Sequence, residues 1–295
     1  MTRWPNTFIV GAAKSGTTSL HTYLGQHPQA FMSPVKEPHF FSGFSQQLGG
    51  YDIDQKQRYR EYLGLFEGTE GFPVVGESSP SYLFDPYAPR EIHETVPDAR
   101  IVVLLRNPVE RAFSHYMMDV RNGVQNLTFY EALLQDWNTE SRGWWTSSLY
   151  IDLGLYATQL SRYLNYFERE QIGVFLFSEL QANPSKLAKE VVTFLGLSPG
   201  PLDELDQSHA YNPYIDPRTE WAWKLLRFRP LHLALRSAIP RKARWWLWNN
   251  VLLKPGTKPE PDHRALQFLK NLYAPQIASL ESMLGRSLPE LRAGW

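Results

Sequence analysis

The stretch "FIVGAAKSGTTSL" (residues 8–20) leads from an apolar run through small residues and one lysine to four hydroxyl side chains and a leucine. A strand, a glycine-containing loop and a helix start of this kind present free backbone N–H groups where the helix dipole favours an anion. A nucleoside-triphosphate loop reads G-x-x-x-x-G-K-[ST], with its lysine directly after the second glycine. Here Lys14 precedes Gly16 by two residues. The stretch predicts a phosphate site of a different kind.

The composition is that of a folded protein without a dominant charge. The chain has 295 residues, of which 43% are hydrophobic, and length alone allows one large domain or two modest ones. Its 30 basic residues balance its 30 acidic ones, so no global field favours nucleic acid. The absence of cysteine excludes disulfides, thiolate metal sites and a catalytic thiol. Because neither a signal-peptide pattern nor a long apolar run is present, we expect a soluble, cytoplasmic protein.

Apolar runs alternate with segments of helical period, which is typical of an α/β fold with a parallel sheet. Strands are predicted at residues 7–12, 73–78, 100–106 and 172–178. Helices are predicted after the first and third strands, at 154–167, at 183–197 and at about 262–284. We expect one domain over residues 1–295, a P-loop-like three-layer fold whose central parallel sheet has helices on both faces. The ligand would lie at the carboxyl ends of the first and third predicted strands.

A second anion site is predicted where the strand at 100–106 ends. A nucleoside triphosphatase needs a magnesium ligand, usually an aspartate, at such a strand end. This strand ends in Arg106, which repels a metal and attracts a phosphate. Asn107, Pro108 and Glu110 then form a helix-start signature, and Ser114 follows in the helix. The alternative is that Arg106 only pairs with a surface carboxylate.

The two motifs together are similar to those of a known family. "AAKSGTTSL" followed by "LLRNPVERAFSHY" resembles the 5′- and 3′-phosphate motifs of sulfotransferases that use 3′-phosphoadenosine 5′-phosphosulfate, PAPS. The nearest subgroup resembles the bacterial relatives of the carbohydrate (heparan sulfate type) sulfotransferases. The resemblance covers most of the chain except about 200–250. Supporting segments in the same order are "KEPHFF" at 36–41, "GESSPSYL" at 76–83, "GLYATQLSRYL" at 154–164 and "LYAPQIASLESMLGRSL" at 272–288.

The resemblance implies how PAPS is bound and how its product, adenosine 3′,5′-bisphosphate (PAP), is released without a metal. Lys14 would stabilise the charge on the departing bisphosphate, and the N–H groups around residues 15–18 would hold the 5′-phosphate. Arg106 and Ser114 would bind the 3′-phosphate. A basic loop over that phosphate would involve Lys254, Gly256 and Lys258. The full implied set is Lys14, Ser15, Gly16, Thr17, Thr18, Ser19, Arg106, Ser114, Lys254, Gly256 and Lys258.

On the acceptor side the resemblance implies that Glu37 is the general base and that His39 aligns it or replaces it. The alternative for "KEP" is a solvated pair of Lys36 and Glu37 before a turn proline. Relatives that act on glycosaminoglycans often carry a lysine where this chain has Ser78. We therefore expect an acceptor that is not a highly anionic polysaccharide.

The segment 200–250 does not continue the alternation of strand and helix patterns. It is expected to form a helical insert rich in tryptophan and arginine. Residues 218–254 hold nine basic side chains and one acidic one, with five tryptophans. A lid over the acceptor site, a core-facing stripe with solvated arginines, and a membrane-interface helix all fit this composition. The lid is the favoured interpretation, and a peripheral membrane contact through 221–250 stays open.

The sequence thus predicts an enzyme that moves a sulfuryl group from PAPS to a hydroxyl, or an amine, of a carbohydrate, lipid or small metabolite. No nucleic acid partner and no metal are expected, and the oligomeric state is left open. Two alternatives remain at this point. One is a P-loop small-molecule kinase, and the other is a non-catalytic nucleotide-binding module associated with a membrane.

Overall fold

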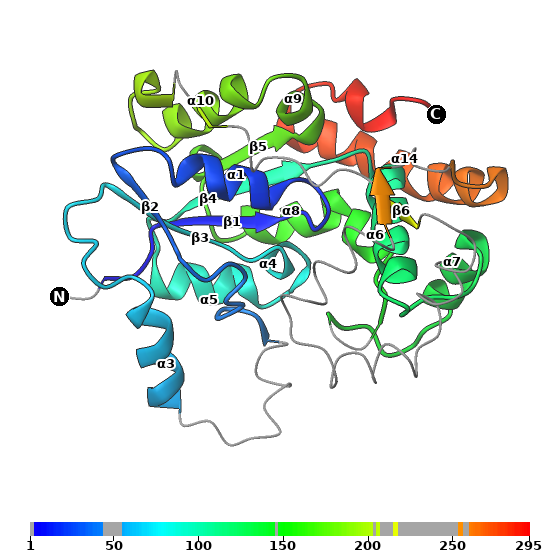
Figure 1. Cartoon of the computed structure of the whole chain (residues 1–295), viewed down its shortest axis with the longest axis horizontal. Coiled ribbons are helices and arrows are strands. Elements are labelled where there is room, and N and C mark those ends of the chain that lie inside the picture. The colour runs from blue at the N-terminus through cyan, green and yellow to red at the C-terminus, as the bar shows by residue number, and fades with distance from the viewer. Residues whose placement is uncertain are drawn as a thin grey trace.

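A parallel sheet of five strands lies at the centre of the molecule (Figure 1). The computed structural model describes residues 3–43, 55–144, 147–202, 205–206, 215–217, 253–255 and 260–295. The strand order is β2-β3-β1-β4-β5, and every neighbouring pair is parallel. The strands are β1 Thr7–Gly11, β2 Ala30–Met32, β3 Val74–Ser78, β4 Arg100–Leu105 and β5 Ile172–Leu176. The predicted α/β class is confirmed, with the strand of the opening stretch in the middle.

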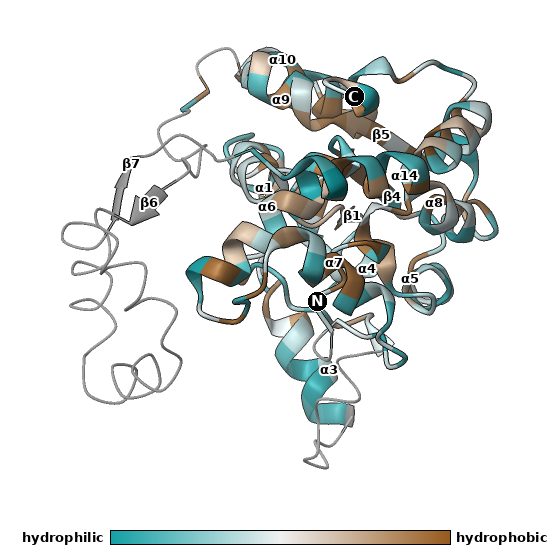
Figure 2. Cartoon of the chain, turned by 90° about the vertical axis from the view of Figure 1, so that its right-hand side faces the viewer, coloured by the Kyte–Doolittle hydropathy of each residue, from teal (hydrophilic) through white to brown (hydrophobic). Residues whose placement is uncertain are grey.

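Helices cover both faces of the sheet because its strands are apolar on both sides. Side chains alternate along β1: Phe8 and Val10 face one core, and Ile9 faces the other. The core with Ile9 is closed by α1 Thr17–Leu24, α9 Phe177–Ala182 and α10 Pro184–Phe194. The core with Phe8 is closed by α3 Gln55–Gly64, α4 Ser81–Phe84, α5 Ala88–Thr95 and α8 Tyr156–Leu164. In Figure 2, α3 is mostly hydrophilic in colour.

A third apolar cluster lies beside the sheet. It joins α6 Pro108–Arg121, α7 Phe129–Trp137 and the long helix α14 His263–Leu284. The start of α6 is the one predicted: Asn107 is the N-cap, its side chain accepts from the N–H groups of Val109 and Glu110, and Pro108 is the first helical residue. The last helix was also predicted correctly, and its N-cap is Asp262. The cluster fixes α6 at the end of β4.

Two glycines make the first strand-to-helix turn possible. A Cβ added at Gly11 would lie 2.7 Å from the Cβ of Leu83. Gly16, the N-cap of α1, has φ 87°, and a Cβ there would lie 2.7 Å from Leu180 and 2.9 Å from Phe177. Only glycine satisfies both the positive φ and the close approach of α9. The loop between β1 and α1 is therefore pressed against the sheet end.

Several elements differ from the sequence prediction. The strand predicted at 172–178 ends at Leu176, because the carboxylate of Glu179 caps the backbone N–H of Leu176 and α9 begins at Phe177. The short strand β2 and the helices α3, α4, α5 and α7 were not predicted.

The predicted insert lies mostly outside the described residues. β6 Ile215–Pro217 pairs with β7 Leu253–Pro255 in antiparallel register, with Lys254 opposite Asp216. Gly256, Lys258 and the whole of 221–250 lie outside the described residues. Within the described part of the chain, no helix has the length and apolar character needed to cross a membrane.

Candidate active site

The predicted site residues lie at the carboxyl ends of three adjacent strands of the sheet. Lys14 follows β1, Arg106 follows β4, and the backbone N–H of Glu37 donates to the carbonyl of Ser78 at the end of β3 (3.0 Å). β1 lies between β3 and β4 in the sheet. The loop of residues 12–19 is therefore in the middle, with Arg106 on one side and the loop of residues 36–42 on the other. Ligands of open α/β sheets bind at this edge.

Lys14 is a cation held among other cations. Its Nζ lies 3.5 Å from the Sδ of Met118 on α6. Burial and, after it, neighbouring positive charges lower the pKa of the Lys14 ammonium to about 8, while Asp119 opposes them. Those positive charges are Arg121, Arg106 and Arg111. Burial removes water from the Lys14 ammonium, and the neighbouring arginines repel it. A bound anion would offset both effects.

Arg106 links the loop to α6. Its guanidinium donates to the carbonyl of Lys14 (3.3 Å) and to the carboxylate of Glu110 (3.0 and 3.2 Å), and it lies 4.6 Å above the ring of Phe177. The surface pairing considered for Arg106 therefore exists, and Glu110 is its partner. That pair is exposed on the glutamate side, so it contributes little stability.

The inner face of α6 carries polar groups beside Lys14 that the sequence reasoning did not single out. Burial, with Arg111 and Lys14 nearby, lowers the pKa of His115 to about 3, so its imidazole is neutral. The Nδ1 of His115 is buried and has no hydrogen-bond partner among the described residues. Asp119 accepts from the hydroxyl of Tyr150 (2.7 Å), and burial raises the pKa of that aspartate. Ser114, the predicted phosphate ligand, is partly exposed on the same helix.

The 36–42 loop holds the predicted base. Glu37 pairs with the ammonium of Lys36, and its Oε2 lies 3.8 Å from the Nε2 of His39. The other ring nitrogen of His39 lies 2.6 Å from the Oγ of Ser81, and its ring centre lies 5.9 Å from that of Trp144. Burial lowers the pKa of His39, so the ring is neutral near pH 7 and can align a carboxylate. Glu37 is half-exposed, as a group that meets a substrate must be.

Three of the predicted site residues have a left-handed backbone. The φ angles are 67° at Lys14, 62° at Glu37 and 52° at His39. A non-glycine residue at positive φ is strained, and such residues gather at functional sites when the surrounding structure holds them. The strain in both loops supports their assignment to one site.

Below the 36–42 loop lies a buried carboxylate that the sequence analysis did not select. Glu77 on β3 is fully buried and accepts hydrogen bonds from Tyr62, Tyr82 and Ser79. Burial raises its pKa to about 7, and the three hydrogen bonds oppose this shift. The sequence could have indicated this buried carboxylate, because Glu77 lies in an apolar strand and both faces of such a strand are buried.

Ser78, at the position where the resemblance implies a lysine in related enzymes, contacts a neutral side chain. Its hydroxyl lies 3.0 Å from the Nδ1 of His21 on α1. Burial, with the charge of Lys36 as a second cause, lowers the pKa of His21 to about 4, so the imidazole is neutral. This position therefore offers no positive charge to an acceptor.

Fold and site together define a class: an α/β protein whose cationic loop follows the central strand of a parallel sheet. The sequence model of the family described as "Sulfotransferase domain" matches residues 5–215. The chain belongs to this sulfotransferase family.

Similar curated proteins include heparan sulfate enzymes. The mouse heparan sulfate glucosamine 3-O-sulfotransferase 6 is 32% identical over 198 residues, which is 66% of this chain and 53% of that protein. The human bifunctional heparan sulfate N-deacetylase/N-sulfotransferase 2 is 30% identical over 213 residues, covering 67% of this chain and 22% of that protein. The chain thus spans about half of the first relative and less of the second. The expected resemblance to heparan sulfate type enzymes is confirmed.

A solved structure agrees over nearly the whole chain. The sulfotransferase from Alicyclobacillus acidocaldarius superposes with a TM-score of 0.72 and 32% identity, covering 98% of this chain and 99% of that one. These findings do not favour the kinase or the non-catalytic alternative. Among the described residues, no group of three or more His, Cys, Asp or Glu side chains is placed to hold a metal ion.

Proposed function

We propose that this protein transfers a sulfuryl group from PAPS to a hydroxyl, or an amine, of a carbohydrate, lipid or small metabolite. The observation that carries the proposal is the hydrogen bond from Arg106 to the carbonyl of Lys14, because it joins the two phosphate motifs at neighbouring strand ends. Family membership supports the reaction class. PAPS, when bound, supplies the activated sulfuryl group.

The chain's residues fit a bisphosphate nucleotide. The cations around Lys14 repel one another, and the buried Nδ1 of His115 beside them lacks a partner among the described residues. We assign the 5′-phosphate to the backbone N–H groups of residues 15–18, with the side chains of Thr17, Thr18 and Ser19 nearby. The 3′-phosphate is assigned to Arg106 and Ser114, and Lys254 lies in the strand β7 that precedes the proposed closing loop.

In the proposed reaction the acceptor oxygen forms a bond to sulfur while the bond from sulfur to the bridging phosphate oxygen breaks. Glu37 takes the acceptor's proton, and the neutral ring of His39 keeps that carboxylate in place. Lys14 compensates the charge that develops on the leaving bisphosphate. The pair of Lys36 and Glu37 opens when an acceptor hydroxyl arrives to bind the carboxylate.

The acceptor class is a separate part of the proposal. The carbohydrate relatives favour a sugar hydroxyl or amine, whereas the neutral pair of Ser78 and His21 favours an acceptor of low negative charge. A panel of matched oligosaccharides with zero, one or several sulfates separates these expectations. Preferential labelling of the uncharged member is expected, and preference for the most sulfated member would contradict it.

The donor is tested by calorimetry and by labelled transfer. Adenosine 3′,5′-bisphosphate should bind without magnesium, and ATP with magnesium should bind much more weakly. The opposite preference would support a kinase. Radiolabelled PAPS offered with the oligosaccharide panel, a lipid alcohol and a phenol then identifies the acceptor. Binding without transfer to any of them, together with full biological activity of Lys14→Ala and Glu37→Ala, would support a non-catalytic module.

A further inference from the structure

Glu77 is a buried carboxylate whose hydrogen-bond partners in the described part of the chain are all hydroxyl groups. Its Oε1 accepts from the hydroxyls of Tyr62 (2.7 Å) and Tyr82 (2.8 Å), and its Oε2 accepts from the Oγ of Ser79 (2.7 Å). A buried charge normally has a partner of opposite charge, because hydration is lost on burial. Hydroxyl donors compensate only part of this cost. A buried carboxylate at this cost in stability suggests a role for Glu77 in orienting the hydroxyl groups that it binds.

Two of the three hydroxyls also hold the 36–42 loop. The Oγ of Ser79 accepts from the backbone N–H of His39, and the hydroxyl of Tyr82 accepts from the backbone N–H of Phe41, both at 3.1 Å. A hydroxyl has a single proton and two lone pairs. When that proton points to Glu77, the lone pairs are free to accept from the loop backbone. The carboxylate therefore sets the direction of both hydrogen-bond chains.

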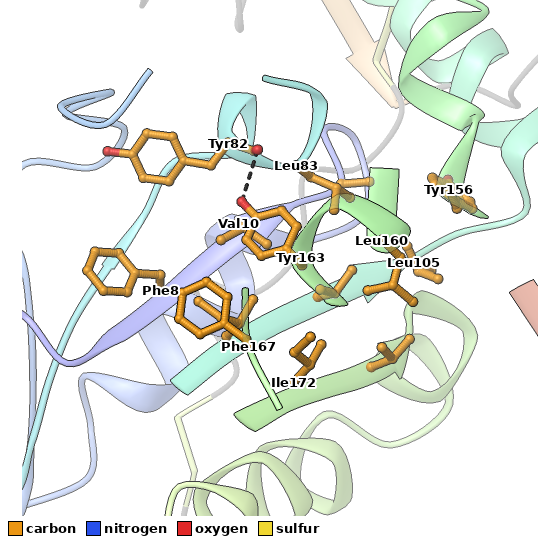
Figure 3. Close-up of a cluster of buried hydrophobic side chains, with 14 of the residues drawn as sticks. Phe8, Val10, Tyr82, Leu83, Leu105, Tyr156, Leu160, Tyr163, Phe167 and Ile172 are labelled. Carbon is orange, nitrogen blue, oxygen red and sulfur yellow. Dashed lines mark hydrogen bonds between the residues drawn. The ribbon is translucent and has the colours of Figure 1, made fainter. Parts of the chain in front are cut away.

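The segment that carries these two hydroxyls, from the end of β3 through α4, is held in place by further hydrogen bonds. Tyr163 on α8 donates to the carbonyl of Tyr82 at 2.9 Å, as Figure 3 shows. The first residue of α4, Ser81, is buried and contacts the ring of His39. The hydroxyls of Ser79 and Tyr82 therefore cannot move away from the 36–42 loop. A change in the direction of their protons changes the hydrogen bonds that they accept from that loop.

We propose that Glu77 is a positioning residue that holds Glu37 and His39 in their working geometry through Ser79 and Tyr82. The inference rests on the proposed function of Glu37 and goes beyond it, because Glu77 itself touches neither substrate nor nucleotide. The left-handed backbone at Glu37 and His39 needs such an anchor. A misplacement of a reacting group by about 1 Å costs on the order of 10²-fold in rate.

The ionisation state of Glu77 decides whether the network is complete. An ionised carboxylate accepts all three hydroxyl protons, whereas a protonated one must donate its own proton and displaces one donor. The other titratable groups that face it are Tyr62 on α3, Tyr82 on α4 and Tyr163 on α8, and burial keeps the pKa of each well above 10. Burial places the pKa of Glu77 at about 7. The loop is therefore anchored above pH 7 and loosened below it.

The test compares Glu77→Gln with Tyr62→Phe. Tyr62→Phe also removes one hydroxyl from Glu77, but it leaves the ring stacked on Phe40 and no backbone group of the loop depends on that hydroxyl. At pH 8 the amides of His39 and Phe41 should exchange with deuterium about three- to tenfold faster in Glu77→Gln, as expected for a lost hydrogen bond. They should be unchanged in Tyr62→Phe. Equal effects in the two variants, or none in Glu77→Gln, would overturn the proposal.

A pH series of the same measurement separates positioning from simple destabilisation. In the wild type, exchange at these two amides, corrected for the intrinsic rate, should increase as the pH falls from 8 to 6. In Glu77→Gln it should be flat. A step of the same size in both variants contradicts the assigned role of Glu77. Ser79→Ala keeps the carboxylate and should release His39 alone, which provides a second variant if Glu77→Gln does not fold.

Turnover gives the third measurement and separates this inference from the proposed function. With labelled PAPS and any acceptor that the panel identifies, or water where none is found, Glu77→Gln should lower kcat about 10- to 100-fold with the KM for PAPS unchanged. If Glu37→Gln is inactive and Glu77→Gln is fully active, the positioning role fails and the base stands. If Glu37→Gln is fully active, the proposed role of Glu37 as base fails, and if the wild type transfers no sulfuryl group, the proposed function fails. In both cases the exchange data still decide what Glu77 holds.

Discussion

The 12–19 loop and the 36–42 loop lie at the same edge of the sheet, but different interactions hold them. Around Lys14, cations gather and repel one another. The 36–42 loop is held by the protein itself. The backbone N–H groups of Glu37, His39 and Phe41 donate hydrogen bonds to the β3–α4 segment. We propose that the first loop is completed by an anionic ligand. The second is built to hold its own side chains before a ligand arrives.

Removing the proposed base, Glu37, should have the largest effect on turnover and should leave nucleotide binding at the other loop unchanged. Glu37→Gln keeps the shape of the side chain and loses the proton acceptor, so kcat should fall about 10²- to 10⁴-fold. Calorimetry with adenosine 3′,5′-bisphosphate should give an unchanged affinity, because the donor loop is untouched. Glu94→Gln, a change at an exposed carboxylate of α5, is the matched control. A large loss of nucleotide affinity in Glu37→Gln would mean that the two loops are not separate in function.

The next largest effect is expected in the donor loop. Lys14→Ala removes the cation closest to the proposed leaving group, and transfer should fall about 10²- to 10³-fold, as for loss of one preorganised donor. Lys186→Ala, at an exposed lysine of α10, is the control. Normal turnover by Lys14→Ala would falsify the mechanism. Rates are measured by release of labelled sulfate ester at saturating PAPS.

Stability against pH distinguishes the two regions in another way. The pKa of Glu77 is raised from 4.5 to about 7, so the folded state binds its proton more tightly than the unfolded state. Stability that is present at pH 4.5 is therefore lost as the pH rises through 7, by about 3–4 kcal/mol at about 1.4 kcal/mol per pKa unit. Urea unfolding of the wild type and Glu77→Gln at pH 5 and pH 8 checks this. The variant should gain stability relative to the wild type at pH 8, and an equal difference at both pH values would contradict it.

The smallest effect is expected at the outer edge of the donor site. Arg106→Ala should weaken binding of adenosine 3′,5′-bisphosphate about 10- to 100-fold, the range for a hydrogen bond to a charged group. Binding of adenosine 5′-phosphate should hardly change, so the advantage of the bisphosphate disappears. Glu110→Gln removes the carboxylate that competes for Arg106 and should leave that advantage intact. Equal losses for both nucleotides would place the 3′-phosphate elsewhere.

The sequence predicted the backbone of the 12–19 loop and of the start of α6 better than the contacts that hold the 36–42 loop. The loop before Gly16 and the Asn107–Pro108–Glu110 signature are contiguous motifs whose geometry follows from neighbouring residues. Two interpretations of Arg106 were open. The structure contains the surface pair with Glu110, and the bond to the Lys14 carbonyl places Arg106 beside the first motif, while phosphate binding by Arg106 stays a prediction.

The residues that anchor the 36–42 loop could not be predicted in the same way. Ser79 and His39 are 40 residues apart in the chain, and their hydrogen bond exists only because β3 places α4 beside that loop. From the sequence alone, Ser79 and Tyr82 fit residues that line the cleft as well as residues of an ordinary turn. β2, with three residues, was too short to give a period. Such contacts depend on sheet order, which no local pattern encodes.

The left-handed backbone at Lys14, Glu37 and His39 has a consequence for engineering. Each such residue costs roughly 1–2 kcal/mol relative to a relaxed conformation, and glycine would remove most of that cost. A laboratory population selected only for heat tolerance should therefore accumulate glycine at these three positions while losing activity. Deep mutational scanning under separate selections for abundance and turnover would then show opposite preferences at these positions, which locates the reacting groups without any knowledge of the substrate.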